Sequence, residues 1–187
     1  MRCKLVVLIA ALALVATPAF AETGWFVGAN FGLTNYAPDT GKGFTLLGWG
    51  DGTSLIGLWQ PGLRIGSTIA GGQDELYVDT GFQYLTGNGT SITSLQLSGN
   101  YQHDFSKPKI PGAYLTAGAG ILSLGASEAS TTTVPVYGVG LGFGNPFAGG
   151  HGRFRIEARF DRQGEDTNSG LSAANLVSLR LGFDVME

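Results

Sequence analysis

The sequence predicts an all-β fold, an eight-stranded antiparallel up-and-down transmembrane β-barrel. Three observations predict it. The first 21 residues have the composition of an export signal. The remainder contains no apolar run of the roughly 20 residues that a spanning helix needs. Its segments between clusters of Gly, Pro, Asn and Ser alternate apolar and polar residues, which is the period of a β-strand. Together these features are typical of the outer membrane of a Gram-negative bacterium.

Residues 1–21 are expected to be a cleaved signal peptide, and residues 22–187 an outer-membrane β-barrel domain. A positive start containing Arg2 and Lys4 precedes an apolar run of 11 residues, and a small-residue cleavage site ends at Ala21. This apolar run is too short to span a membrane as a helix. We therefore expect removal of the leader and not a membrane anchor.

The composition supports one domain and excludes several kinds of site. Charged residues make up 13% of the chain, about half the ~25% usual in soluble domains, so part of the surface is expected to face something other than water. Without the leader, nine basic residues oppose 14 acidic ones, which argues against nucleic acid as a partner. The single cysteine, Cys3, lies in the leader. The mature chain therefore has no disulfide, thiolate metal site or cysteine nucleophile.

Eight segments show strand-like alternation between turn signals. Their ranges are 24–34, 55–70, 75–86, 92–105, 112–125, 134–144, 153–162 and 174–186. Most reach the ~9–11 residues that a tilted strand needs to cross a bilayer. The number is even, as is usual for bacterial single-chain barrels.

The first strand follows the leader directly, and the next three each have one apolar and one polar face. In the second strand, the apolar face has Trp59, Leu63, Ile65 and Ile69, and the polar face has Gln60, Arg64 and Thr68. In the third strand, the apolar face has Leu76, Val78, Phe82 and Tyr84, and the polar face has Glu75, Asp79 and Gln83. In the fourth strand, the apolar face has Leu95, Leu97 and Tyr101, and the polar face has Gln96, Ser98, Asn100 and Gln102. Each apolar face is expected to contact lipid, because the opposite face carries charge.

Glycines mark the inward faces of the fifth and sixth strands. They are Gly118 and Gly120 in the fifth strand and Gly138, Gly140 and Gly142 in the sixth. The next strand along the chain carries Arg155 and Arg159. We expect the small residues to leave room for these large ones in a narrow lumen.

The seventh strand decides which face points inward. Phe154, Ile156, Ala158 and Phe160 alternate with Arg155, Glu157, Arg159 and Asp161. An arginine that faces lipid at mid-bilayer costs about 2–4 kcal/mol, so the charged face must point into the barrel. The last strand agrees, with Leu179, Leu181, Phe183 and Val185 opposite Ser178, Arg180, Gly182 and Asp184. The alternative is a soluble barrel with these charges outside and an apolar core.

The inward charges are predicted to form an ion-paired network in the barrel interior. Its members are Arg64, Arg155, Arg159 and Arg180 with Asp79, Glu157, Asp161 and Asp184. The four cations balance the four anions, and charges buried in a lumen must be paired. An eight-stranded barrel is just wide enough for side chains to fill, so we expect a filled interior and not an open pore.

The connections alternate in character, with short turns on one side and mostly longer loops on the other, as in outer-membrane barrels. The turn-like ones are 71–74, 106–111 and 145–152, and the mostly longer ones are 35–54, 87–91, 127–133 and 163–173. The connection 87–91 is shorter than this pattern predicts. The first long loop contains Phe44, Leu46, Leu47 and Trp49. It either binds a surface partner or extends the barrel wall beyond the membrane, and we favour the second interpretation.

Aromatic residues are predicted to form two bands at the membrane interfaces. Trp25, Tyr101, Phe105, Phe143, Phe154 and Phe183 fall near the short turns, and Trp59, Phe82, Tyr84, Tyr137 and Phe160 fall near the long loops.

Four segments carry a resemblance to a known superfamily. They are GWFVGANFG at 24–32, AYLTAGAG at 113–120, RIEARFD at 155–161 and LRLGF at 179–183. With them the mature chain resembles the small OmpA/OmpX-type outer-membrane barrels. The resemblance implies insertion by the barrel-assembly machinery, and outer-membrane lipid and lipopolysaccharide as partners. Such proteins usually end in an aromatic residue, whereas this chain ends at Glu187, with Phe183 and Val185 keeping the outward alternation.

We expect a monomeric, non-enzymatic protein without catalytic residues, cofactor or metal site. Some similar barrels modify lipid A, which would require a histidine with a serine and an acid. His103 and His151 both fall at the short turns, on the predicted periplasmic side, whereas lipid A occupies the other leaflet. Asp104 follows His103 directly and must point to the opposite face. Structural, adhesion or recognition roles for the surface loops remain. The alternatives are a narrow channel gated by the interior salt bridges or, less favoured, a lipid A-modifying enzyme.

Overall fold

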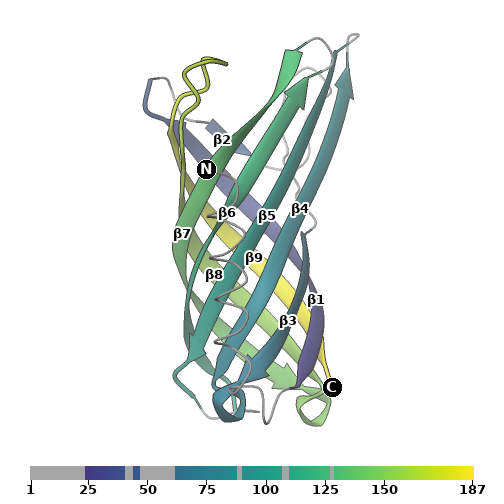
Figure 1. The fold of residues 1–187 in the computed structure, drawn as a ribbon. Helices are drawn as coiled ribbons and strands as arrows, with labels where there is room; N and C mark the ends of the chain where they lie inside the picture. The colour runs from purple at the N-terminus through teal and green to yellow at the C-terminus, as the bar shows by residue number, and fades with distance from the viewer. Residues whose placement is uncertain (1–23, 41–43, 47–61, 88–89, 107–109, 127–128) are drawn as a thin grey trace, which may run out of the picture.

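The computed structural model of the chain describes residues 24–40, 44–46, 62–87, 90–106, 110–126 and 129–187. These residues form one antiparallel sheet (Figure 1). Its strands are β1 (Trp25–Pro38), β2 (Phe44–Leu46), β3 (Gly62–Ile69), β4 (Asp74–Gly87), β5 (Thr90–Asp104), β6 (Gly112–Ala126), β7 (Ala129–Phe147), β8 (Gly152–Gln163) and β9 (Ala174–Met186).

The first and last long strands close the sheet into a barrel. β1 pairs with β9 from Phe26↔Met186 to Pro38↔Ala174, and the long strands between them pair with their neighbours in sequence order. The short β2 pairs only with the far part of β1, at residues 34–36. Closure removes the unpaired edges that would otherwise invite association. The predicted eight-stranded antiparallel up-and-down barrel is therefore confirmed.

Two turns with the same sequence mark one end of the barrel. The short helices η2 (Ala70–Gly72) and η3 (Ala148–Gly150) each consist of Ala-Gly-Gly, and their central residues Gly71 and Gly149 have φ of 68° and 70°. Glycine adopts this left-handed conformation without the steric cost of a Cβ. Figure 1 places both turns at the lower end, beside the C-terminus. This end is called the short-turn end below, and the opposite one the long-loop end.

Several strands extend further than predicted, because polar residues read as loops continue the pairing. β7 begins at Ala129 and not at 134, and Ser123 of β6 pairs with Thr133 of β7. The β-branched threonines of this stretch suit a strand despite their polarity. β9 has the bounds that were predicted. Of the predicted strand 55–70, residues 55–61 lie outside the described residues.

The described part of the first long loop extends the barrel wall. β1 continues to Pro38, and its upper residues pair with both β9 and β2. Phe44 and Leu46 belong to β2, whereas Leu47 and Trp49 lie outside the described residues.

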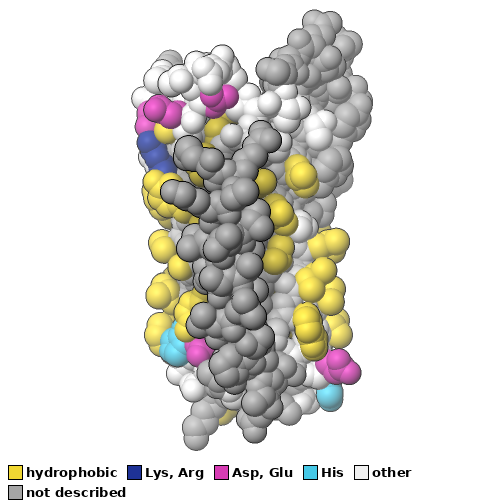
Figure 2. All heavy atoms as spheres, in the orientation of Figure 1, with side chains coloured by type: hydrophobic (Ala, Val, Ile, Leu, Met, Phe, Trp, Pro, Cys, Tyr) yellow, Lys and Arg dark blue, Asp and Glu magenta, His cyan; other side chains and the backbone are white. Residues whose placement is uncertain are grey.

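The two faces of the barrel have opposite chemistry. On β8, the residues at odd positions from Arg153 to Gln163 are buried, and Phe154, Ile156 and Phe160 are exposed. Figure 2 shows hydrophobic side chains at mid-height on both sides of the visible face, with acidic side chains toward its upper and lower ends and histidine toward its lower end. The charged face points into the lumen, so the alternative of a barrel with an apolar core and outward charges is wrong. Within the described residues, no helix is long and apolar enough to cross a membrane.

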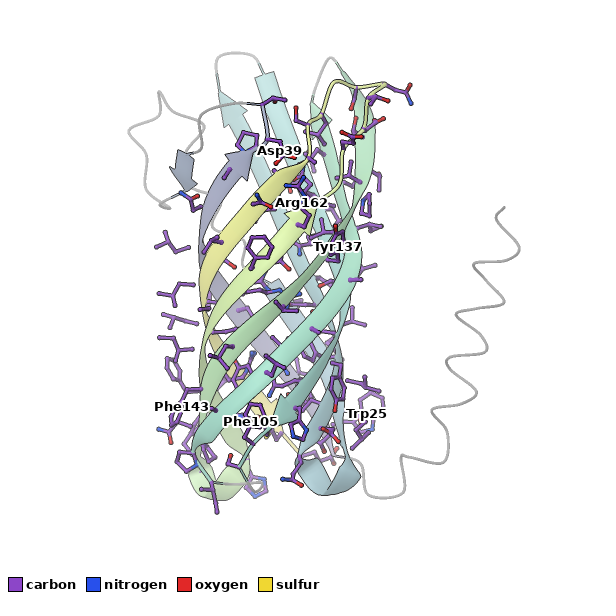
Figure 3. The ribbon with its side chains drawn as sticks, turned by 90° about the vertical axis from the view of Figure 1, so that its left-hand side faces the viewer. Trp25, Asp39, Phe105, Tyr137, Phe143 and Arg162 are labelled. Carbon is purple, nitrogen blue, oxygen red and sulfur yellow. The ribbon has the colours of Figure 1, made fainter. Side chains whose placement is uncertain are left out.

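Exposed aromatic side chains occur toward both ends of the apolar outer surface of the barrel, which is called the outward belt below. At the short-turn end these are Trp25, Tyr101, Phe105, Phe143, Phe154 and Phe183. Figure 3 shows Trp25, Phe105 and Phe143 at this level and Tyr137 well above them. Tyr137 and Phe160 are also exposed. Trp59 and the side chains of Phe82 and Tyr84 lie outside the described part of the structure.

Candidate functional site

The eight charged residues predicted for the interior all lie in the lumen. Seven of them are at most 9% exposed: Arg64, Asp79, Arg155, Glu157, Arg159, Asp161 and Asp184. The Arg180 side chain is 19% exposed. The strands that carry them surround the lumen, so the charges meet across it and form two connected clusters.

The first cluster is centred on Arg64, toward the short-turn end. Its guanidinium stacks 3.6 Å from the ring centroid of Tyr77 and 4.8 Å from that of Phe26. It binds the carboxylate of Glu75 and lies 4.0 Å from that of Asp184. The charge is thus held between two aromatic faces and two carboxylates, which together offset its removal from water.

Arg155 and Arg153 extend this cluster. Arg155 donates from Nε and Nη2 to the two carboxylate oxygens of Asp184, at 2.6 and 3.1 Å. Arg153 makes a similar pair of bonds to Asp104, at 2.9 and 2.6 Å, and donates to Glu75 at 2.7 Å. Such two-pronged pairs are both strong and specific in geometry. Because β8 lies opposite β4 and β5 in the strand order, Arg153 joins opposite walls of the barrel.

The second cluster surrounds Arg180, further from the short turns. Arg180 lies 3.5 Å from Asp79 on β4 and 3.2 Å from Asp161 on β8. Asp161 also accepts a 2.8 Å bond from Arg159, whose guanidinium lies 3.9 Å from Glu157. All eight predicted residues therefore lie within 4.0 Å of an opposite charge.

Asn30 on β1 connects the two clusters, and sequence reasoning missed it. It accepts a 2.8 Å bond from Arg155 and donates a 2.9 Å bond to Asp79. Glu75, Asp104 and Arg153 were also absent from the predicted network, although strand parity places all three inward. All three stand at or next to the ends of the predicted strands, and the predicted network comprised only charges in the strand interiors.

The predicted use of the inward glycines was only partly right. A Cβ on Gly142 would lie 2.2 Å from the Tyr114 ring, and one on Gly138 would meet Asp161. The room for arginines comes from other glycines, Gly144 beside Arg153 and Gly182 beside Arg155. Gly182 is the direct register partner of Arg155, whereas Gly144 is paired with Arg155 and the space beside it is filled by Arg153, two residues earlier on β8.

The interior is not polar along its whole length, which corrects the expected polar lumen. Leu122, Val134 and Val136 point inward and are buried, with Leu124 and Leu171 packed against them. Leu171 belongs to the β8–β9 loop and is held by paired backbone hydrogen bonds with Asp166. The folded loop shields these apolar side chains from water, so an apolar layer is stable there.

Comparison with known proteins bears on the fold. No protein-family model and no curated protein sequence matches the chain. Among solved structures, Neisserial surface protein A superposes with a TM-score of 0.62 at 13% identity, over 86% of this chain and 96% of that one. Ail, the attachment invasion locus protein of Yersinia pestis, superposes with a TM-score of 0.51 at 14% identity, over 89% and 99%.

The chain has the fold of the small OmpA/OmpX-type outer-membrane barrels. The predicted resemblance is confirmed at this level. The covered shares show that the likeness extends over nearly the whole of both relatives and leaves out little of the described barrel. At such low identity, the roles of the residues in the lumen and at the two ends of the barrel have to be inferred from the structure of this chain.

Two polar clusters lie on the outside of this barrel, one toward each end. At the short-turn end, His103 faces outward and Asp104 is buried, on opposite faces as alternation predicts. The carboxylate that His103 contacts is instead Asp74 across the strand pair, at 2.7 Å from Nδ1. No described serine or threonine hydrogen-bonds to His103. In the described ranges, no three His, Cys, Asp or Glu side chains are grouped as metal ligands.

At the long-loop end, Arg162 joins Asp39 to the barrel (Figure 3). Arg162 donates to both carboxylate oxygens of Asp39 and to Asn175. The Asp39 backbone N–H donates to Ala173 O at 2.9 Å. The side-chain hydrogen bonds from Arg162 hold the pKa of Asp39 below its ordinary value of 3.8.

The Arg162–Asp39 ion pair is expected to protect the Asp39 amide from hydrogen exchange in a pH-dependent way. Because the pKa of Asp39 is depressed, its stabilising effect is present above the ordinary value of 3.8 and is lost as pH falls through the lower folded value. Arg162→Ala should therefore speed hydrogen exchange of the Asp39 amide at pH 6, relative to the parent, and this effect should shrink as the pH is lowered below 3.8. Amide exchange followed by NMR measures this ratio. A ratio that does not change with pH would contradict it.

Proposed function

We propose that this chain is an integral outer-membrane protein of a Gram-negative bacterium, without enzymatic activity, whose surface loops serve attachment or recognition. The observation that carries the proposal is the inverted distribution of side chains. Large apolar residues cover the outside, including Val27, Leu97, Leu141 and Leu181, while the charges point inward. A water-facing barrel would gain nothing from this arrangement, whereas a lipid-facing one requires it.

The attachment role is supported by the relatives with the same fold. One is described as a surface protein and another as an attachment invasion locus protein. In this chain the strands at the long-loop end extend past the aromatic level of Tyr137, so they would hold the loops clear of the lipid (Figure 3). Loops on a rigid scaffold are where binding residues concentrate.

The proposal includes the route to the membrane. Residues 1–21 would direct export and be removed after Ala21, and the barrel-assembly machinery would insert the remaining chain as a monomer. Lipid and lipopolysaccharide would then contact the outward belt. Glu187 donates its backbone N–H to Trp25 O, so the chain beyond Phe183 and Val185 keeps its pairing with the first strand.

Gel migration tests the proposal most directly. Outer-membrane fractions from cells that express the chain are run on a denaturing gel with and without boiling. We expect a band in this fraction that migrates faster before boiling, because a closed barrel resists detergent. A band in the soluble periplasmic fraction that does not shift would overturn the assignment.

The channel alternative makes a different prediction, and the cross-lumen contacts argue against it. Arg153 joins Glu75 and Asp104 on the opposite wall, and Arg180 joins Asp79 to Asp161. We expect the parent protein in planar bilayers to show no discrete conductance steps. Steps whose size changes in Arg159→Ala or Glu157→Ala would instead support a narrow channel controlled by the salt bridges.

A further inference from the structure

A carboxylate stands on the outward face of the barrel at the short-turn end. Asp74 begins β4 and lies directly opposite His103 of β5 in the register. Its Oδ1 accepts a 2.8 Å bond from the Tyr101 hydroxyl and lies 2.7 Å from His103 Nδ1. All three side chains therefore meet outside the wall, separate from the lumen network.

Two atoms of this cluster point away from the existing bonds. Oδ1 of Asp74 receives both contacts, and no described residue donates to its Oδ2. His103 turns Nδ1 toward Asp74, and no described residue hydrogen-bonds to its Nε2. When Nδ1–H donates to the carboxylate, a neutral imidazole presents Nε2 as an acceptor. The side chains of His103 and Asp74 are 43% and 20% exposed, so both are accessible from outside the barrel.

The position of the cluster indicates what is available to bind there. The His103 ring packs edge-on against Phe105, with ring centroids 5.3 Å apart. Phe105 is exposed and belongs to the aromatic band at the short-turn end, at the level of Trp25 and Phe143 (Figure 3). In an outer-membrane barrel, such bands lie at the height of the lipid headgroups. The two acceptors are thus presented to the headgroups of the periplasmic leaflet.

We propose that Asp74 and His103 bind the primary ammonium group of phosphatidylethanolamine, a proposal that rests on the outer-membrane location proposed above. The ammonium has three N–H donors, enough to reach Asp74 Oδ2, His103 Nε2 and a water at once. It also supplies the positive charge that a carboxylate at the edge of an apolar belt needs. A choline headgroup has no N–H to donate, and a glycerol headgroup has no cation. The site therefore discriminates among phospholipids by headgroup.

Lipid retention measures this preference. The refolded protein is placed in bilayer nanodiscs with equal amounts of phosphatidylethanolamine, phosphatidylcholine and phosphatidylglycerol, released into mild detergent, and the bound lipids are counted by native mass spectrometry. We expect phosphatidylethanolamine to be retained on the order of tenfold over phosphatidylcholine, as for loss of a charge-assisted hydrogen bond. Asp74→Asn and His103→Gln should each remove most of this preference.

Matched control variants distinguish loss of lipid binding at Asp74 and His103 from effects that any change of a histidine or carboxylate would have. His151→Gln changes the other histidine at the short-turn end, and Asp39→Asn changes an outward carboxylate at the other end; both should keep the parent preference. Tyr101→Phe should also keep it, because Oδ2 and Nε2 are unaffected. Equal retention of the three lipids by the parent would overturn the proposal, as would an equal loss in His103→Gln and His151→Gln.

Folding is checked on each variant by the gel shift on boiling. If Asp74→Asn does not fold, His103→Gln decides the question. A barrel that folds and fractionates with the outer membrane but shows no lipid preference would overturn only the phosphatidylethanolamine site. Failure to fractionate with the outer membrane would overturn the proposed location.

Discussion

Arg64→Ala is expected to lower the free energy of unfolding by about 3–5 kcal/mol, the usual effect of breaking a buried ion pair. Arg64 is fully buried, and its removal would leave Glu75 with Arg153 alone and deprive Asp184 of one of its two guanidinium neighbours. The contacts of the Arg64 guanidinium with the rings of Phe26 and Tyr77 would be lost as well. Both carboxylates are buried, so the free-energy cost of leaving them without a full set of partners stays in the folded state.

Urea titration of the protein in lipid vesicles measures this loss, with the unboiled gel band reporting the folded fraction. Arg162→Ala, at a side chain that is 27% exposed and lies outside the lumen, serves as the control and should leave the midpoint close to that of the parent. A second variant, Arg64→Met with Glu75→Gln, removes the charge from both partners and should recover a substantial part of the loss. An Arg64→Ala barrel as stable as the parent would show that the lumen charges are hydrated and not dependent on each other.

Gly138→Ala is expected to destabilise the barrel by about 1–3 kcal/mol, although it adds a single methyl group. The new Cβ would lie 2.3 Å from the Phe160 carbonyl oxygen and 2.1 Å from Asp161 Oδ1. The carbonyl belongs to the neighbouring strand and cannot move without breaking the ladder. Asp161 would be displaced from Arg159 and Arg180, both of which it binds.

Gly99→Ala is the matched control, since a Cβ there meets nothing within 4 Å. Both variants change glycine to alanine in the middle of a long strand, so backbone entropy changes alike. Only the inward one should shift the urea midpoint downward. Equal effects of the two substitutions would mean that backbone entropy and not lumen packing decides the outcome.

Alternation along single strands was enough to assign the inner and outer faces. Arg155, Glu157, Arg159 and Asp161 follow each other at every second residue, and the cost of charge in lipid leaves one orientation. The same rule placed His103 and Asp104 on opposite faces. It also places Arg153 inward, two residues before Arg155 at the start of the same strand. Faces could be predicted because the direction of a side chain depends only on its own strand.

The pairing of these charges could not be predicted in the same way. Arg153 meets Glu75 and Asp104 from 78 and 49 residues away, and Arg155 meets Asn30 from 125 residues away. These contacts depend on the register of every strand between them and on the closure of β1 against β9. The outward pair of Asp74 and His103 likewise required the β4–β5 register.

Residue composition gave wrong predictions at two places where backbone pairing or side-chain packing determines the structure. The polar stretch at the start of β7 resembled a loop, yet Thr133 pairs with Ser123, because backbone pairing accepts a polar β-branched residue. Val134 and Val136 point into a lumen that was expected to be polar, and Leu171 covers them from a distant loop. A strand's period is a local property of the chain and is present in the sequence. What fills the space inside the barrel depends on all eight long strands at once, and only the closed structure brings those side chains together.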